Sequence, residues 1–188
     1  MAQHYRLPEA MSDLLLKMRH VRASDAEAVH DLLQSDHVNR GTMRLSIESL
    51  SMVTGRIAET PGATKIVAVR GGAVAGYAEL IRYPKLPRHW HCADINLIAT
   101  HPGHRGKGVG HALLQQMVDL ADKWLQIVRL LFVARAGNRR AIALYEAFGF
   151  AIEGRMPGYV FLDGAYEDAL VMRRLRPFAD RIADRGEG

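Results

Sequence analysis

The sequence predicts a single domain of mixed α/β structure. Its 188 residues suit one domain with a full core. Short β-rich runs alternate with segments of helical periodicity in the order β-α-α-β-β-β-α-β-α-β-β, with no internal repeat and no low-complexity linker. Two dipeptides, Gly71-Gly72 and Asp163-Gly164, mark tight turns between β-rich runs, so each of these runs should pair with its neighbour as an antiparallel hairpin.

In the N-terminal half, two helices are expected between the first strand and the first hairpin. Residues 1–14 show no periodicity and are expected to form an extension to a domain that spans 15–176. Ser24 and Asp25 supply an N-cap, and Thr60-Pro61-Gly62 ends the second helix. The expected elements are a strand over 15–21, a helix over 24–33, a loop over 36–45, a helix over 46–58 and strands over 64–69 and 74–81.

The C-terminal half begins with a strand that runs into a glycine-rich turn and a helix. The helix has an apolar face through Val109, Leu113 and Met117, and Gly149 ends the next helix. The expected elements are strands over 91–99 and 127–134, helices over 108–120 and 138–148, strands over 158–162 and 166–172, and a tail over 177–188.

Composition and charge exclude several classes of protein. The formal charge is +5 and the pI is about 9.6, but the basic residues are scattered and lack interleaved aromatic side chains, so no nucleic-acid partner is expected. No segment approaches the roughly 20 apolar residues that span a bilayer. The apolar cluster at 14–16 lacks the features of a secretory signal, and the single cysteine, Cys92, fits a reducing compartment. These features predict a cytoplasmic protein without a membrane partner.

The most informative segment is Arg105-Gly106-Lys107-Gly108-Val109-Gly110, which joins a strand to a helix. Glycines let the backbone approach a phosphate closely, and the first-turn N–H groups and dipole of the helix favour negative charge. The spacing lacks the Ser or Thr of a Walker loop and does not match Gly-x-Gly-x-x-Gly. The segment therefore predicts a phosphate-bearing cofactor of another kind.

Two further motifs complete a family resemblance. Arg105-x-x-Gly108-x-Gly110 resembles the acyl-CoA pyrophosphate loop of the GNAT-type N-acetyltransferase superfamily, and the segment from Asn138 through Tyr145 to Phe150 resembles its second signature. The stretch from Glu153 to Ala169 is similar to bacterial small-molecule and L-amino-acid N-acetyltransferases. The resemblance implies a central, mostly antiparallel sheet flanked by helices, acetyl-CoA as acyl donor and no metal.

The resemblance also assigns the cofactor contacts. The backbone of Ile98 and Thr100 would pair with the pantetheine amides like an added strand, although the family commonly has valine at position 100. Arg105 and Lys107 could instead be exposed loop charges, and Asn138 a plain N-cap. The assigned cofactor residues are Ile98, Ala99, Thr100, Arg105, Gly106, Lys107, Gly108, Val109, Gly110, Asn138 and Tyr145.

Acetyl transfer to an amine needs a proton donor and a proton acceptor. In the family, the tyrosine that matches Tyr145 protonates the departing CoA thiolate, whereas the alternative role for Tyr145 is a core aromatic residue. Asp94 is the first candidate for the base, acting through a water, and Glu79 is the second; either could instead be a structural strand residue. His91 is a third candidate.

No metal site is expected from the histidines, and the cysteine is expected to be structural. His89, His91, His101 and His104 lack a carboxylate or cysteine set that would complete a metal site. Cys92 has no neighbour in the sequence that would lower its pKa, and the family transfers acetyl directly without an acyl-enzyme.

The sequence therefore predicts an acetyl-CoA-dependent N-acetyltransferase whose acceptor is the primary amine of a small molecule, with an amino acid favoured. Two alternatives stay open: a peptide or protein N-acetyltransferase that acts on an N-terminus or a lysine, and a catalytically silent acyl-CoA sensor. Segments 36–46 and 82–90 would shape the acceptor opening. A homodimer is an expectation from the family alone.

Overall fold

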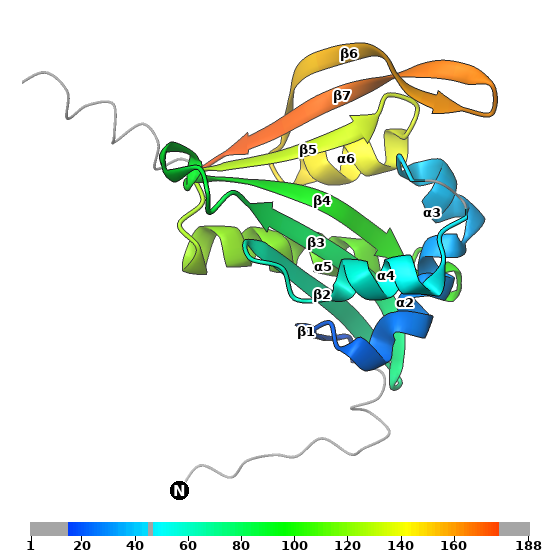
Figure 1. The fold of residues 1–188 in the computed structure, drawn as a ribbon. Coiled ribbons are helices and arrows are strands. Elements are labelled where there is room, and N and C mark those ends of the chain that lie inside the picture. The colour runs from blue at the N-terminus through cyan, green and yellow to red at the C-terminus, as the bar shows by residue number, and fades with distance from the viewer. Residues whose placement is uncertain (1–14, 45–46, 177–188) are drawn as a thin grey trace, which may run out of the picture.

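The computed structural model describes residues 15–44 and 47–176, and these form a seven-stranded sheet (Figure 1). The strand order is β1-β2-β3-β4-β5-β7-β6, and every neighbouring pair is antiparallel except β4 and β5. The strands are β1 (Lys17–His20), β2 (Ala63–Arg70), β3 (Ala73–Arg82), β4 (Cys92–Thr100), β5 (Arg129–Arg135), β6 (Ala151–Leu162) and β7 (Ala165–Leu175). The expected extension over 1–14 and tail over 177–188 lie outside the described residues.

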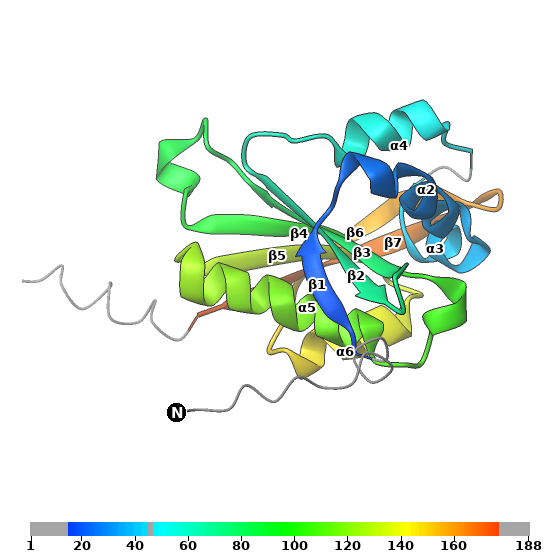
Figure 2. The same ribbon diagram turned by 90° about the horizontal axis from the view of Figure 1, so that it is seen from below.

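Helices cover both faces of the sheet (Figure 2). Helices α2, α3 and α4 lie on one face, and α5 and α6 lie on the other. Their bounds are α2 (Ala26–Gln34), α3 (Asp36–Gly41), α4 (Leu50–Ile57), α5 (Val109–Asp119) and α6 (Arg139–Ala147), with a π-helical turn over Leu120–Trp124. None of the helices in these ranges is long and apolar enough to cross a membrane.

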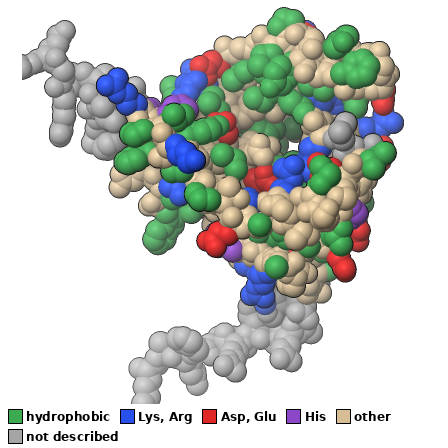
Figure 3. All heavy atoms as spheres, viewed as in Figure 1, with side chains coloured by type: hydrophobic (Ala, Val, Ile, Leu, Met, Phe, Trp, Pro, Cys, Tyr) green, Lys and Arg blue, Asp and Glu red, His purple; other side chains and the backbone are tan. Residues whose placement is uncertain are grey.

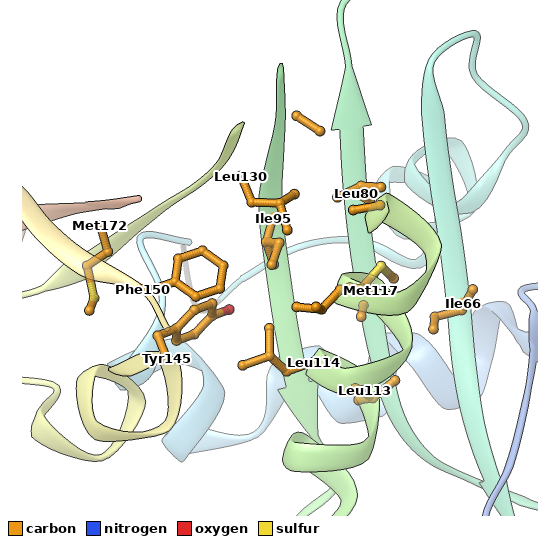
Figure 4. Close-up of a cluster of buried hydrophobic side chains, with 14 of the residues drawn as sticks. Ile66, Leu80, Ile95, Leu113, Leu114, Met117, Leu130, Tyr145, Phe150 and Met172 are labelled. Carbon is orange, nitrogen blue, oxygen red and sulfur yellow. The ribbon is translucent and has the colours of Figure 1, made fainter. Parts of the chain in front are cut away.

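Two apolar cores hold these layers together. The larger core joins α5 and α6 to the sheet through fully buried side chains such as Leu113, Leu114 and Met117 (Figure 4). The smaller core packs α2 and α4 on the opposite face, through Val29, Leu32 and others. Helix α5 approaches β3 so closely that a Cβ at Gly76 would lie 2.8 Å from side-chain atoms of Leu113 and Val109. The sheet is thereby fixed from both sides, as the predicted mixed α/β class requires.

Both predicted hairpins are present. Gly71 and Gly72 adopt positive φ angles of 57° and 76° between β2 and β3. Asp163 and Gly164, with φ angles of 50° and 80°, connect β6 to β7. These are the conformations that a tight turn between antiparallel strands demands.

Three predicted boundaries need correction. Residues 36–41 form the short helix α3 instead of a loop, because buried Val38 anchors a helix too short to show periodicity. Helix α4 begins at Leu50, where Ser49 accepts a hydrogen bond from Met52 N (3.2 Å). Strand β6 covers 151–162 instead of 158–162; Pro157 and two register shifts interrupt its pattern, as an edge strand tolerates.

The sheet opens between β4 and β5. These parallel strands pair only from Cys92–Arg129 to Asp94–Leu131, after which β4 stays with β3 and β5 stays with β7. Figure 1 shows the two strands diverging toward α3 and α6. A bulge at Asn96 interrupts the pairing of β4 with β3, because Leu80 faces Ile95 while Glu79 faces Leu97. Beyond Asp94, one edge of β4 is therefore left without a neighbouring strand.

Candidate active site

A cleft of about 780 Å³ lies where β4 and β5 diverge. Figure 3 shows this face hollowed near its centre, with basic and acidic side chains beside the hollow. The cleft is lined by residues of α3 and the segment after it, of β4 and the loop that follows, of β5 and of α6. Among the described residues that line it, Asp94 is the one carboxylate, whereas arginines are contributed by five positions: Arg44, Arg56, Arg105, Arg135 and Arg140.

At one end of the cleft, the glycine-rich loop presents backbone amides. Gly106 and Gly108 have φ angles of 74° and 80°, a conformation that side chains disfavour. Gly108 is the N-cap of α5 and offers no side chain to cap it, so the N–H groups of the first turn are left for another acceptor. Val109 and Gly110 continue this wall. The loop therefore fits a pyrophosphate, as the sequence predicts.

Two arginines accompany these amides at the cleft surface. Arg105 comes from the loop itself, and Arg140 comes from the first turn of α6. Lys107, which the sequence analysis also assigned to the cofactor, is not brought to the cleft: its Nζ donates to the carbonyl oxygen of Gly103 (2.9 Å). The cationic partner that the structure offers in its place is Arg140.

The open edge of β4 supplies the next part of the wall. Ile98, Ala99 and Thr100 line the cleft beyond the last β4–β5 pair, where a pantetheine chain could add as a strand. The carbonyl oxygen of Thr100 already accepts a hydrogen bond from His37 Nε2 of α3 (2.8 Å). A carbonyl has two lone pairs, so this bond leaves room for a second donor.

Asn138 acts as the N-cap of α6, which was the structural alternative for this residue. Its Oδ1 accepts from Ala141 N (3.2 Å), and its Nδ2 donates to the carbonyl oxygen of Gly41 (3.1 Å). The side chain therefore ties the end of α3 to the start of α6 across the mouth of the cleft. Asn138 lines the cleft while its amide group is committed to protein partners.

Tyr145 is a buried residue of α6 that lines the cleft. Its ring is only 2% exposed, stacks on Phe132 (ring centroids 3.8 Å apart) and meets Phe150 edge to face (Figure 4). The hydroxyl oxygen is buried and has no hydrogen-bond partner among the described residues. Burial raises the pKa of Tyr145 well above its ordinary value, so the hydroxyl keeps its proton. An unpartnered donor on a residue that lines the cleft fits a ligand atom that will accept from it.

Asp94 is the matching acceptor. One carboxylate oxygen, Oδ2, accepts a hydrogen bond from the hydroxyl of Tyr83, while Oδ1 is buried and has no partner within 15–44 and 47–176. Burial, followed by the hydrogen bond to Asp94, raises the pKa of Tyr83 to about 12, so Tyr83 is a proton-bearing donor at neutral pH. The free Oδ1 belongs to a residue that lines the cleft, which suits a proton acceptor.

Glu79 does not reach the cleft, which disfavours its predicted role as a base. Its side chain is about 3% exposed, and both oxygens are engaged: Oε1 accepts from Tyr77 OH (2.8 Å) and Oε2 from Asn96 Nδ2 (2.5 Å). The Asn96 bulge brings that amide to the carboxylate. Glu79 lies behind the wall and acts on the cleft only through its neighbours.

The remaining candidates lie away from the cleft. His91 is exposed just before β4 and packs near His89 (ring centroids 6.3 Å apart). Cys92 is buried and free, and burial raises the pKa of its thiol, as expected for a structural cysteine. Within 15–44 and 47–176, no group of three or more His, Cys, Asp or Glu side chains is placed to hold a metal ion.

Sequence reasoning missed several residues of the cleft. His37, Arg44, Arg56 and Arg140 all line it, and none was singled out. The pair Arg139-Arg140 was visible only as a short basic run. Arg44 and Arg56 lie on segments whose packing against β3 and β4 is set by tertiary structure, so no local motif marks them.

Free amides, a phenol and a carboxylate oxygen without partners among the described residues suit a transferase that takes its acyl group from CoA. Residues 26–150 match the model of the Acetyltransferase (GNAT) family, so this chain belongs to the GNAT family of acetyltransferases. L-amino acid N-acetyltransferase AaaT of Escherichia coli K12 is 31% identical over 88% of this chain and 100% of its own length. Spermidine N(1)-acetyltransferase of the same strain is 25% identical over 88% of this chain and 87% of its own.

Solved structures show the same architecture. A phosphinothricin acetyltransferase from Sinorhizobium meliloti, in complex with acetyl-CoA, matches with a TM-score of 0.76 and 25% identity over 87% of this chain and 89% of its own. A spermidine N-acetyltransferase from Vibrio cholerae, in complex with CoA and spermine, matches with a TM-score of 0.75 and 22% identity over 85% of this chain and 95% of its own. The second of these supports the fold alone. The mostly antiparallel sheet flanked by helices, predicted from the family resemblance, is confirmed.

Proposed function

We propose that this protein transfers the acetyl group of acetyl-CoA directly to the amine of a small molecule, and that the acceptor is an amino acid. One observation carries the proposal: a proton donor, Tyr145 OH, and a proton acceptor, Asp94 Oδ1, both without partners in the described part of the chain, belong to residues of the same cleft. Acetyl transfer to an amine needs one group of each kind. The free amides of the loop at 106–110 supply the anchor for the pyrophosphate of the donor.

The two groups account for the proton movements of the reaction. Asp94 takes a proton from the acceptor ammonium, directly or through a water, and so frees the nitrogen lone pair. The nitrogen bonds to the thioester carbonyl carbon, and the carbon–sulfur bond breaks with its electron pair going to sulfur. Tyr145 then gives its proton to the sulfur, and the second proton of the nitrogen passes to the phenolate of Tyr145, directly or through water. This leaves a neutral N-acetyl product, the CoA thiol and a reprotonated Tyr145. Both substrates must occupy the cleft at once, because no covalent enzyme intermediate is formed.

The mouth of the cleft favours a small acceptor over a polypeptide. Asn138 joins α6 to the carbonyl of Gly41 (3.1 Å), and Arg40 of α3 pairs with Asp163 of the β6–β7 turn (3.1 Å). Gly41 and Asn138 both line the cleft, so the first contact joins two of its walls, whereas a peptide needs a groove open at both ends. The presence of both Asp94 and Tyr145 favours turnover over a silent acyl-CoA sensor. The 31% identical relative is an L-amino acid N-acetyltransferase, which supports the acceptor class.

An amine-panel assay tests the proposal. Purified protein is incubated with acetyl-CoA and single amines: amino acids, polyamines, a lysine peptide and a peptide with a free N-terminus. Release of the CoA thiol is measured with a colorimetric thiol reagent, and the acetylated product is identified by mass spectrometry. We expect release with small amines, and amino acids should be among the best. Binding of acetyl-CoA without release for any amine would favour the sensor, and release with peptides alone would favour the protein acetyltransferase.

We also propose that the protein acts in the cytoplasm as a homodimer. The single cysteine, buried and free, supports a reducing compartment. Exposed aromatic side chains on the β6–β7 hairpin, Tyr159, Phe161 and Tyr166, support a self-association surface. Light scattering on the purified protein tests the dimer: a monomeric mass at micromolar concentration would contradict it.

A further inference from the structure

Behind one wall of the cleft lies a group of charged side chains that the acetyl transfer itself does not use. It consists of Arg44, Glu48, Arg56 and Glu79, which come from the segment after α3, the segment before α4, α4 itself and β3. Glu48 pairs with Arg44, and its Oε1 lies 3.8 Å from Arg56 Nη2. Arg56 Nη1 in turn lies 3.6 Å from Glu79 Oε1. We refer to these four residues as the arginine cluster.

The arginine cluster presents its positive side chains, and not its negative ones, to the cleft. Arg44 and Arg56 line the cleft, whereas Glu48 and Glu79 do not. The side chains of Arg44 and Glu48 are only 11% and 10% exposed, and that of Glu79 is 3% exposed. The carboxylates therefore stand behind the arginines and hold them, and a molecule inside the cleft meets the positive side of the cluster.

The two guanidinium groups have donors to spare. Each guanidinium carries five N–H donors, while the distances from Arg56 to its carboxylates exceed hydrogen-bond length. Burial, and after it the proximity of Arg56, lowers the pKa of Arg44 to about 10, because the charged guanidinium is withdrawn from water and lies near a second cation. In the same segment, Thr42 Oγ1 is buried, has no partner among the residues that the structure describes, and belongs to a residue that lines the cleft. An anion would satisfy all of these groups.

The cluster is also connected to the reacting end of the cleft. Glu79, which lies beside Arg56, accepts a hydrogen bond from Asn96 (2.5 Å). Asn96 is two residues from Asp94 on β4 and lines the cleft with it. The arginines and the proposed base, Asp94, are thus linked through Asn96 and Glu79. An amino acid has the complementary charges, with a carboxylate beside the amine that reacts.

We infer that Arg44 and Arg56 bind the carboxylate of the acceptor and thereby determine specificity for amino acids over polyamines. The inference rests on the proposed function and identifies the residues that select its substrate. A planar guanidinium binds a carboxylate through two parallel hydrogen bonds, and a buried site strengthens them. A polyamine would bring additional positive charge against two arginines and would be repelled.

The test compares acceptors that differ only in the carboxylate: an amino acid, its methyl ester and its decarboxylated amine. In the unaltered protein, we expect the KM for the amino acid to be at least about tenfold below that for either analogue. In Arg44→Gln and Arg56→Gln, the KM for the amino acid should rise by at least about tenfold, while the KM values for acetyl-CoA and for the analogues stay constant. Arg56→Lys keeps the positive charge but loses the two parallel N–H donors of the guanidinium, so its KM for the amino acid should lie between those of the unaltered protein and Arg56→Gln.

Arg174→Gln is the matched control. Arg174 is also a half-buried arginine bonded to a carboxylate, Asp122 (2.8 and 2.9 Å), but it does not line the cleft. It should lose a comparable amount of thermal stability without any change in acceptor preference. Thermal unfolding of all variants identifies any that do not fold, and the comparison of acceptors in the unaltered protein does not depend on them.

The outcomes separate this inference from the proposed function. If acetyl is transferred to amines with equal KM for the three acceptors, the role of Arg44 and Arg56 is overturned while the transferase activity stands. A rise in KM for all three acceptors alike in the arginine variants would also overturn it. If no amine in the panel is acetylated, the proposed function itself fails.

Discussion

The two ends of the cleft are built in different ways. The end that we propose for the donor, called the donor end, uses backbone groups of one continuous segment, the loop at 105–110 and the first turn of α5. The end that we propose for the acceptor, called the acceptor end, uses side chains from separate elements: Arg44, Arg56 of α4, Asp94 of β4 and, behind them, Glu79 of β3. The donor end depends on local conformation, whereas the acceptor end depends on how helices pack on the sheet. Substitutions should therefore affect the two ends separately.

The largest effect should come from Asp94→Asn at the acceptor end. This variant retains the shape of the side chain and an acceptor for Tyr83, but it loses the basic oxygen. We expect kcat to fall at least about 100-fold, the usual contribution of a positioned base, with the KM for acetyl-CoA unchanged. Steady-state kinetics with both substrates measure this. Glu79→Gln is the comparison, and its kcat should fall far less, since Glu79 lies outside the cleft; equal losses would contradict the assignment of the base.

Tyr145→Phe sharpens the comparison at the point where the two ends meet. Removal of the proton donor should lower kcat by about tenfold or more and leave acetyl-CoA affinity unchanged. Because the hydroxyl is buried without a partner, its removal should not destabilise the fold and should raise the free energy of unfolding by about 1 kcal/mol. Kinetics and denaturant unfolding on the same preparation test both statements. A Tyr145→Phe variant with a lower free energy of unfolding and normal turnover would instead show that Tyr145 is a structural core residue.

Gly110→Phe tests the donor end alone. A Cβ at this position meets only ordinary contacts, 3.5 Å from Thr100 Oγ1 and 3.9 Å from Leu144 Cδ2, so the helix can form while the ring fills the cleft. Acetyl-CoA affinity, measured by calorimetry, should fall by at least about tenfold, the loss of about one charge-assisted hydrogen bond. Gly55→Ala in α4 is the control, because its Cβ meets nothing within 4 Å. Unchanged affinity in Gly110→Phe would remove the loop from the donor site.

The smallest effect on catalysis should come from Asp25→Asn, outside both ends. Arg19 bonds both oxygens of Asp25 (2.7 and 2.8 Å), and these bonds hold the pKa of Asp25 below its ordinary value. A lowered folded-state pKa stabilises the fold above the unfolded-state pKa and ceases to do so as the pH falls through the folded-state value. The free energy of unfolding of the variant should therefore be lower by about 2 kcal/mol at pH 7, and the difference should shrink progressively below pH about 4. Its kcat should be unchanged at 25 °C. A pH-independent difference in denaturant unfolding would contradict this.

The difference between the two ends also explains what could be predicted from the sequence. The positive φ angles of Gly106 and Gly108 and the helix start at Val109 agree with the sequence, because turn conformation and helix termini are local properties. That this loop binds the donor stays a prediction. The exceptions were side-chain contacts: Lys107 bonds to Gly103, and Arg140 takes the place at the cleft. The element order was predicted in full apart from α3, and the edge strand β6 was longer than predicted because Pro157 breaks its pattern.

The acceptor end could be predicted only in part. Asp94 and Glu79 were both candidates for the base, and the sequence could not separate them, since their exposure depends on the bulge at Asn96 and on the packing of Arg56. Arg44 and Arg56 carry no motif. Strand register and helix placement bring these residues together, and both are properties of the assembled fold.

The central claim is that both ends are filled at once and that acetyl passes directly between the two substrates. Initial velocities with acetyl-CoA and an amino acid, each varied at several fixed concentrations of the other, test it most directly. Direct transfer should give double-reciprocal lines that intersect, together with no acetylated protein in mass spectra after incubation with acetyl-CoA alone. Parallel lines and a stable acetyl group on the protein would contradict it.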